Sequence, residues 1–219
     1  RWCNLLEPDA AKRAENLQRV TEGLALADEI GARCCVDIAG SFNAEVWYGP
    51  HPDNLSPRFF DAVVENARKI IDAVQPKRAK FCYEMMGWAL PDSADSYVDL
   101  VKAIARDGFG VHLDPCNIIN SPARYYRNRD VLNECFDKLG PWIVSCHAKD
   151  VTWDVEMQVH FREVVLGAGT LDYATYLKRL AALPQSPPLM IEHMKGAAEY
   201  DQSRKYLLEV AEKVGVRFG

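Results

Sequence analysis

Apolar residues follow two patterns that alternate along the chain. Segments with apolar residues three or four positions apart predict amphipathic helices, and the short apolar runs between them predict strands buried on both faces. The predicted helices cover residues 9–30, 57–74, 92–107, 129–139, 171–182 and 199–213. The predicted strands cover residues 34–39, 79–84, 109–114, 142–147 and 188–192. This alternation predicts an α/β fold with a parallel sheet.

The ends of several predicted helices carry recognisable signals. Gly31 and Gly108 are typical of the residues that end a helix, and Ser56 followed by Pro57 has the form of a helix start. No linker or low-complexity segment divides the chain. We therefore expect one domain over residues 1–219.

Two architectures fit an alternating pattern, an open doubly wound sheet and a (β/α) barrel. An open sheet that binds nucleotides normally has a glycine-rich turn after an early strand. No predicted strand is followed by such a motif, and the LGAGT segment at 166–170 lacks the required spacing. A barrel instead predicts polar chemistry at the carboxyl ends of successive strands.

Four successive predicted strands end in a side chain that can bind a metal or exchange a proton. These residues are Glu84, Asp114, His147 and Glu192. A barrel would bring them to one mouth, where three carboxylates and an imidazole suit a divalent cation. Any one of them alone could instead cap a loop or form a salt bridge. The four together favour a site.

Composition narrows the classes of function. The net charge is −5, which argues against binding to nucleic-acid phosphates, and the apolar runs are too short for a membrane span. The seven cysteines are odd in number and form no CxxC pair. They predict free thiols in a reducing compartment, and hence a cytoplasmic protein.

The motifs resemble those of the xylose-isomerase-like barrels, over essentially the whole chain. The supporting segments are HLDPCN at 112–117, HAKD at 147–150, LGAGTLDY at 166–173 and IEHM at 191–194. This family includes ketose 3-epimerases, inosose isomerases and dehydratases, and many sugar isomerase or epimerase proteins. The resemblance implies a small-molecule carbohydrate or cyclitol substrate and one divalent metal ion. Mn²⁺ fits this ligand set best, and Mg²⁺, Co²⁺ and Zn²⁺ stay open.

In the epimerases of this family the first and last glutamates bind the metal and exchange a proton with the substrate carbon. Carried over, Glu84 and Glu192 are catalytic residues as well as ligands, beside Asp114 and His147. The metal would polarise the ketose carbonyl and stabilise an enediolate. One carboxylate then removes the proton, and the other returns it to the opposite face.

One position departs from the epimerase pattern. These enzymes usually carry a histidine three residues after the metal aspartate, whereas this chain has Asn117. His112 lies two residues before Asp114, so both should face the barrel interior. His112 could contact substrate, carry a proton, or only pack in the interior.

Further residues are candidates for substrate contacts. Lys149 should face the same mouth as His147, and Arg162 precedes the LGAGT loop. Trp47 and Trp88 follow strand ends, where they could form an apolar wall against a sugar. Solvated loop residues, salt bridges and ordinary loop packing are the alternatives. His193 alternates with Glu192 and should face the helix layer.

Four functions stay open. The leading one is a metal-dependent sugar or cyclitol isomerase or epimerase. A lyase or dehydratase acting on a keto-sugar, keto-cyclitol or keto-glycoside would use the same metal. A DNA-repair endonuclease would need a trinuclear zinc cluster and a basic face, which five histidines and the negative charge argue against. The fourth is a non-catalytic sugar-binding module.

The resemblance also predicts how much of the barrel this chain contains. A complete (β/α)8 TIM barrel has eight strands in about 250 residues. The four site residues identify the predicted strands as the fourth to the eighth, so we expect the first three strands to be missing from this chain. An open barrel, or one completed by another chain, is then expected. A homodimer is the base-rate expectation.

Overall fold

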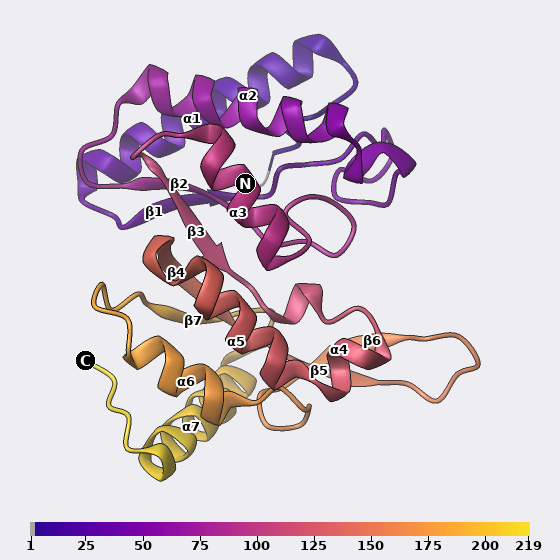
Figure 1. Cartoon of the computed structure of the whole chain (residues 1–219), viewed down its shortest axis with the longest axis vertical. Coiled ribbons are helices and arrows are strands. Elements are labelled where there is room, and N and C mark those ends of the chain that lie inside the picture. The colour runs from indigo at the N-terminus through magenta and orange to yellow at the C-terminus, as the bar shows by residue number, and fades with distance from the viewer. Residues whose placement is uncertain (1–2) are drawn as a thin grey trace. The chain divides into compact units, whose positions relative to one another are not determined.

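The computed structural model describes residues 3–219, which form two compact units (Figure 1). The first unit comprises the described residues up to His112 together with Trp142–Val144, and the second comprises Leu113–Pro141 and Ser145–Gly219. The sequence-based expectation of a single domain over 1–219 stays a prediction.

The first unit contains three helices and three strands within its described residues. They are α1 (Ala10–Ile30), β1 (Cys34–Asp37), α2 (Pro57–Val74), β2 (Lys80–Glu84), α3 (Ala94–Ile104) and β3 (Phe109–Leu113), whose last residue belongs to the second unit. β2 pairs with β1 on one side and with β3 on the other, and both pairs are parallel as predicted. α1 and α2 lie side by side against this sheet (Figure 1).

The predicted helix starts and stops of the first unit have clear physical causes. The Ser56 hydroxyl accepts the backbone N–H of Phe59 at 3.2 Å and so caps α2, which begins at Pro57. Gly31 ends α1 with φ = 73°, a backbone conformation that glycine adopts without strain. α3 ends earlier than predicted, because Ala105 takes up the left-handed conformation before Gly108 is reached.

Aromatic packing and one tyrosine hydroxyl hold the strands of the first unit together. Phe81, Tyr83 and Phe109 are in mutual ring contact in its buried core. The hydroxyl of Tyr97 donates to the backbone carbonyl of Tyr83 at 2.5 Å and accepts the backbone N–H of His112 at 3.3 Å. Helix α3 thereby fixes the carboxyl ends of β2 and β3.

The second unit contains the remaining elements. They are α4 (Pro122–Tyr126), α5 (Asn128–Leu139), β4 (Ile143–Ala148), whose first two residues belong to the first unit, β5 (Asp150–Trp153), β6 (Phe161–Val164), α6 (Tyr173–Ala181), β7 (Leu189–Ile191) and α7 (Ala197–Val214). β4 and β7 pair in parallel, with His147 opposite Met190. Short 3₁₀ turns cover Pro52–Leu55, Cys116–Ile118 and Gly140–Trp142.

Two tyrosines of α6 anchor the carboxyl end of β4. Tyr176 donates its hydroxyl to the carbonyl of His147 at 2.9 Å, and Tyr173 donates to the carbonyl of Lys149 at 2.7 Å. Residues three apart lie on the same face of a helix, so one face of α6 holds both backbone positions. The backbone that carries His147 and Lys149 is therefore rigidly placed.

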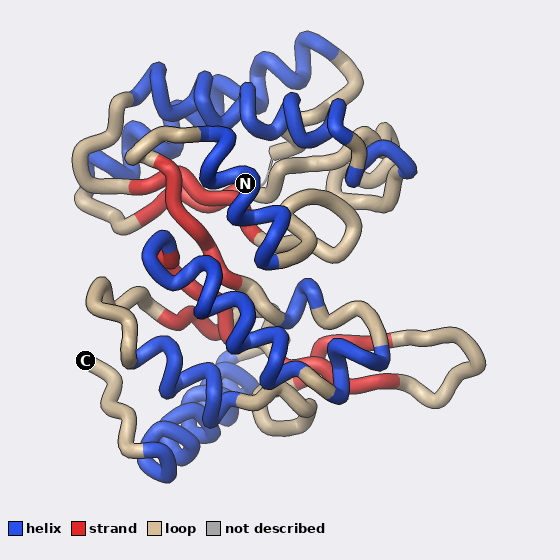
Figure 2. Tube along the Cα trace, viewed as in Figure 1, coloured by secondary structure: helices blue, strands red, loops and turns tan. Residues whose placement is uncertain are grey.

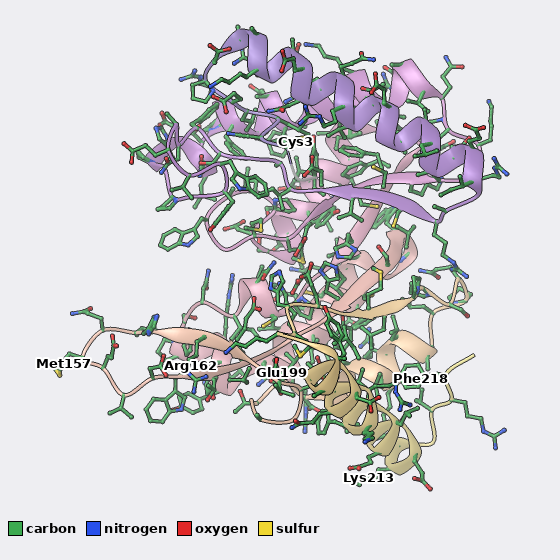
Figure 3. The ribbon with its side chains drawn as sticks, turned by 180° about the vertical axis from the view of Figure 1, so that it is seen from behind. Cys3, Met157, Arg162, Glu199, Lys213 and Phe218 are labelled. Atoms are coloured by element: carbon green, nitrogen blue, oxygen red, sulfur yellow. The ribbon has the colours of Figure 1, made fainter. Side chains whose placement is uncertain are left out.

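The antiparallel hairpin β5–β6 is absent from the sequence-based prediction. Val151 lies opposite Glu163, and Trp153 lies opposite Phe161. The connecting loop extends beyond the two strands (Figure 2). Met157, which is 98% exposed, lies at its tip (Figure 3). Arg162 lies nearer the rest of the second unit (Figure 3). Among residues 3–219, no helix combines the length and the apolar character that crossing a bilayer requires.

Candidate metal centre

Three of the four predicted ligands lie together in the second unit. Asp114 directly follows β3, His147 lies in β4, and Glu192 directly follows β7. Nδ1 of His147 is 3.2 Å from Oδ2 of Asp114 and 3.2 Å from Oε2 of Glu192. One ligand atom from each of the three residues lies within 4.8 Å of the others. Since metal–ligand bonds are about 2.0–2.6 Å long, these atoms can reach one ion.

Lys149 brings a positive charge into the same cluster, although only 2% of this residue is exposed. Its Nζ lies 2.7 Å from Oδ2 of Asp114 and 3.4 Å from Oε2 of Glu192. Nζ also donates to Oδ1 of Asn117 at 2.7 Å. A buried ammonium group needs such partners. Asn117, which stands where the epimerases carry a histidine, therefore helps to hold Lys149.

Asp114 is the electrostatic centre of the cluster and is fully buried. Burial alone would raise the pKa of this carboxyl group. The charge of Lys149, together with hydrogen bonds from His147 and Lys149, outweighs burial and holds the pKa of Asp114 below its ordinary value. Asp114 is thus a carboxylate at neutral pH, which is the form that binds a cation.

Two residues that the sequence analysis missed extend the cluster. Glu163, on β6, places Oε1 3.5 Å from Nζ of Lys149 and Oε2 2.7 Å from Nδ1 of His193. Nε2 of His193 lies 3.4 Å from Oε2 of Glu192. No motif or spacing marks Glu163, because the short hairpin strands give no clear periodic signal.

The expected alternation of His193 with Glu192 is wrong. Alternation holds only within a strand, and β7 ends at Ile191. His193 then has φ = 61°, which turns the backbone so that its imidazole comes close to the carboxylate of Glu192. A strand end at Ile191 cannot be recognised from the apolar pattern alone.

Asp150 holds the glycine-rich loop that follows β6. Its carboxylate accepts the backbone N–H groups of Gly167, Gly169 and Leu171 at 2.9, 3.1 and 3.0 Å. A Cβ at Gly169 would lie 2.2 Å from Oδ1 of Asp150, so only glycine fits there. The LGAGT motif is therefore structural, and it fixes the chain between β6 and α6.

Of the other predicted site residues, Glu84, His112, Trp47 and Trp88 belong to the first unit and Arg162 belongs to the second. Glu84 and His112, both buried, are paired in register at the carboxyl ends of β2 and β3 in the first unit. Trp88 in that unit is 62% exposed, and the Trp47 ring packs edge-on against Tyr48. Arg162 of the second unit forms an ion pair with Asp154 at 2.7 Å.

The residues of the second unit fit a divalent cation. Asp114, Glu163 and Glu192 carry three formal negative charges and Lys149 one positive charge, which leaves −2 when both histidines are neutral. Oε2 of Glu192 is buried and makes no hydrogen bond within residues 3–219, although three nitrogen atoms lie within 3.4 Å of it. Two carboxylates and an imidazole are donors that hard and borderline divalent ions accept.

The comparisons with known proteins identify the family and the fold of this chain. Residues 3–210 match the family described as xylose isomerase-like TIM barrel, and the chain belongs to this family. This confirms the class of fold that the sequence motifs predict. No curated protein sequence matches significantly.

Solved structures show the same fold at low sequence identity. A xylose isomerase-like TIM barrel protein from Mycobacterium smegmatis in complex with magnesium is 19% identical, with a TM-score of 0.72 over 94% of this chain and 70% of that one. D-psicose 3-epimerase with D-tagatose from Clostridium cellulolyticum is 16% identical, with a TM-score of 0.66 over 98% and 75%. Endonuclease IV from Thermus thermophilus is 16% identical, with a TM-score of 0.68 over 95% and 72%.

Proposed function

We propose that this protein is a divalent-metal-dependent isomerase or epimerase of a sugar or cyclitol. One observation carries the proposal: ligand atoms of Asp114, His147 and Glu192 lie close together. One of these atoms, Oε2 of Glu192, is buried and makes no hydrogen bond among the described residues. Membership of a family that includes sugar isomerases supports it. The psicose 3-epimerase with the same fold supports the substrate class.

Asp114, His147 and Glu192 would hold the metal, with Glu84 as the fourth ligand expected from the sequence. Oxygen-rich donors with one imidazole favour Mn²⁺, and Mg²⁺, Co²⁺ and Zn²⁺ are the alternatives. Bound there, the cation would act as a Lewis acid on a substrate carbonyl and thereby acidify the adjacent C–H bond.

Glu192 is the proposed base. Its carboxylate takes the proton from the carbon next to the carbonyl, and the electrons of the broken C–H bond form the double bond of an enediolate. Glu84 returns a proton to the opposite face in an epimerisation. Lys149, held by Asp114 and Asn117, can donate a hydrogen bond to a substrate oxygen that gains negative charge.

We also propose that four further residues contact the substrate. His112 is proposed to meet the substrate from the end of β3, and Arg162 from β6. Trp47 and Trp88 are proposed to form an apolar wall against a sugar face.

A lyase or dehydratase is the second candidate, and the Lys149–Glu192 contact favours it. Elimination needs a base to remove a proton and an acid to protonate the leaving oxygen. The ammonium of Lys149 lies 3.4 Å from the carboxylate of Glu192, so an acid and a base are adjacent. Product analysis separates the two reactions, because epimerisation preserves the substrate mass and elimination does not.

The remaining proposals concern partners and location. We propose a small carbohydrate or cyclitol as the substrate, a homodimer as the assembly, and no nucleic acid, since the chain carries a net charge of −5. The seven cysteines, all within the described residues, form no disulfide, which supports a reducing, cytoplasmic location.

The proposed function is tested by metal analysis followed by solvent-deuterium exchange into a panel of ketoses and inososes. We expect one divalent ion per chain and exchange at the carbon next to the carbonyl. Glu192→Gln should abolish exchange, whereas Glu134→Gln, which alters an exposed helix ion pair, should retain it. Full exchange activity in Glu192→Gln would falsify the assigned base.

A further inference from the structure

We infer that Glu163 and His193 are positioning residues that hold the carboxylate of Glu192. The inference rests on the proposed function and adds two residues to its site. The side chains of Lys149, Glu163, His193 and Glu192 form a closed ring of contacts. Around the ring, the distances are 3.5 Å from Lys149 to Glu163, 2.7 Å from Glu163 to His193, 3.4 Å from His193 to Glu192 and 3.4 Å from Glu192 to Lys149.

The backbone at His193 supports a role for this ring. His193 has φ = 61°, a left-handed conformation that side-chain-bearing residues adopt only at some cost. The turn lets two consecutive side chains, Glu192 and His193, meet at Oε2 of Glu192. An unfavourable backbone angle directly beside a proposed metal ligand points to a functional constraint.

The ring restricts where the Glu192 side chain can go. Glu192 lies just past the end of β7, where its backbone N–H donates to the carbonyl of Ala148 at 3.3 Å. His147 and Lys149 already contact its Oε2 at 3.2 and 3.4 Å, and His193 adds a third contact. His193 lies against Oε2 from one side, and Glu163 holds the imidazole through Nδ1 at 2.7 Å. The hairpin strand β6 thereby fixes the orientation of a carboxylate that follows β7.

These two residues are well placed to affect metal binding without controlling folding. The side chains of Glu163 and His193 are 39% and 53% exposed. Ion pairs at such exposure contribute little to stability, so variants should fold. Partners that orient a metal ligand, by contrast, commonly change metal affinity by about 10–100-fold when they are removed.

The test compares His193→Asn and Glu163→Gln with the intact chain. Asparagine tolerates the left-handed conformation and lacks the imidazole, and glutamine keeps the shape of glutamate without its charge. His160→Asn is the matched control, because His160 is 55% exposed and lies 3.2 Å from a carboxylate oxygen of Asp154. The readouts are the Kd for Mn²⁺ by calorimetry, the visible spectrum of the Co²⁺-loaded protein, and thermal unfolding of the metal-free protein.

We expect both variants to bind Mn²⁺ at least about tenfold more weakly and to alter the Co²⁺ spectrum, with the control unchanged. If His193→Asn fails to fold, Glu163→Gln alone carries the test. The inference would be overturned, and the proposed function would stand, if the variants fold, bind Mn²⁺ with a Kd within about twofold of the intact chain, and leave the Co²⁺ spectrum unchanged. An intact chain that binds neither Mn²⁺ nor Co²⁺ would overturn the proposed function, and the inference with it.

Discussion

Lys149 is a buried ammonium group surrounded by oxygen atoms that the proposed metal also needs. Oδ2 of Asp114 and Oε2 of Glu192 lie 2.7 and 3.4 Å from its Nζ. Without a metal, Lys149 balances part of the negative charge of these carboxylates. In the proposed function, a bound metal would take over that task, and the ammonium would be available to a substrate oxygen. Lys149 therefore links the stability of the metal-free protein to its chemistry.

Replacement of Lys149 by methionine tests this balance. Lys149→Met keeps most of the volume but leaves the buried carboxylate of Asp114 and the partly exposed carboxylate of Glu192 without their cation, which should cost about 3–5 kcal/mol of stability in the metal-free protein. Mn²⁺ should restore more stability to the variant than to the intact chain. Urea unfolding with and without Mn²⁺ measures both effects. Equal stability of the two metal-free proteins would contradict the prediction.

Asp37 gives a pH dependence that is separate from the second unit. It ends β1, is 3% exposed, and accepts the backbone N–H of Ile38 at 2.9 Å. Burial outweighs this hydrogen bond and raises the pKa of Asp37 to about 7 from 3.8. The folded state therefore binds more protons than the unfolded state between about pH 4 and pH 7, so stability falls as the pH rises through this range.

The Asp37→Asn variant should not lose stability in this way as the pH rises. Each pKa unit corresponds to about 1.4 kcal/mol, so the effect in the intact chain approaches about 4 kcal/mol across the range. Urea unfolding of both proteins from about pH 4.5 to about pH 8 measures the difference. Parallel pH profiles for the two proteins would show that Asp37 is ionised when folded.

At the scale of elements, the carboxyl ends of β4 and β7 and the hairpin β5–β6 build the centre together. Tyr173 and Tyr176 of α6 hold the backbone of Lys149 and His147. Asp150, at the start of β5, accepts hydrogen bonds from the loop after β6. Glu163 then reaches the cluster from β6. The centre thus depends on a loop that one carboxylate organises.

Gly169→Ala should disrupt that loop. A Cβ there would lie 2.2 Å from Oδ1 of Asp150 and 2.6 Å from the carbonyl oxygen of Val151, and overpacking of this kind costs about 1–3 kcal/mol. Gly196→Ala is the control, because no atom lies within 4 Å of its added Cβ, and we expect a loss below about 1 kcal/mol. Thermal unfolding compares the two. Equal losses would show that the loop moves freely to accept a side chain.

The same elements show what the sequence can and cannot predict. The five parallel strands and the long helices follow from apolar periodicity and from caps such as Ser56 and Gly31. Asp114, His147 and Glu192 follow from their places at strand ends, because the carboxyl ends of parallel strands share one edge of a sheet. The hairpin and Glu163 could not be found in this way, because two four-residue strands have no distinctive period. His193 escaped prediction because its orientation depends on one backbone angle.

At the scale of the whole molecule, the two units can respond differently to a metal. Asp114, His147 and Glu192 all belong to the second unit, whereas Glu84 belongs to the first. A ligand that binds only the folded state stabilises the segments that hold it. Metal binding is therefore expected to protect backbone amides near each true ligand from exchange.

Hydrogen–deuterium exchange with and without Mn²⁺ tests this expectation. Protection should increase around residues 113–117, 145–150, 166–171 and 189–193, and also around 80–85 if Glu84 is a ligand. Glu192→Gln should reduce these changes. Protection confined to the second unit would remove Glu84 from the set of ligands, and no change anywhere would argue against a metal centre.

The exposed tip of the hairpin has a practical consequence. Met157 is 98% exposed at the end of a loop that extends beyond β5 and β6, whereas Met85 is fully buried. A thioether that solvent reaches this freely is the first to react with mild oxidants or with methionine-selective labelling reagents. The tip therefore offers a natural handle for attaching a dye or a solid support to the intact chain.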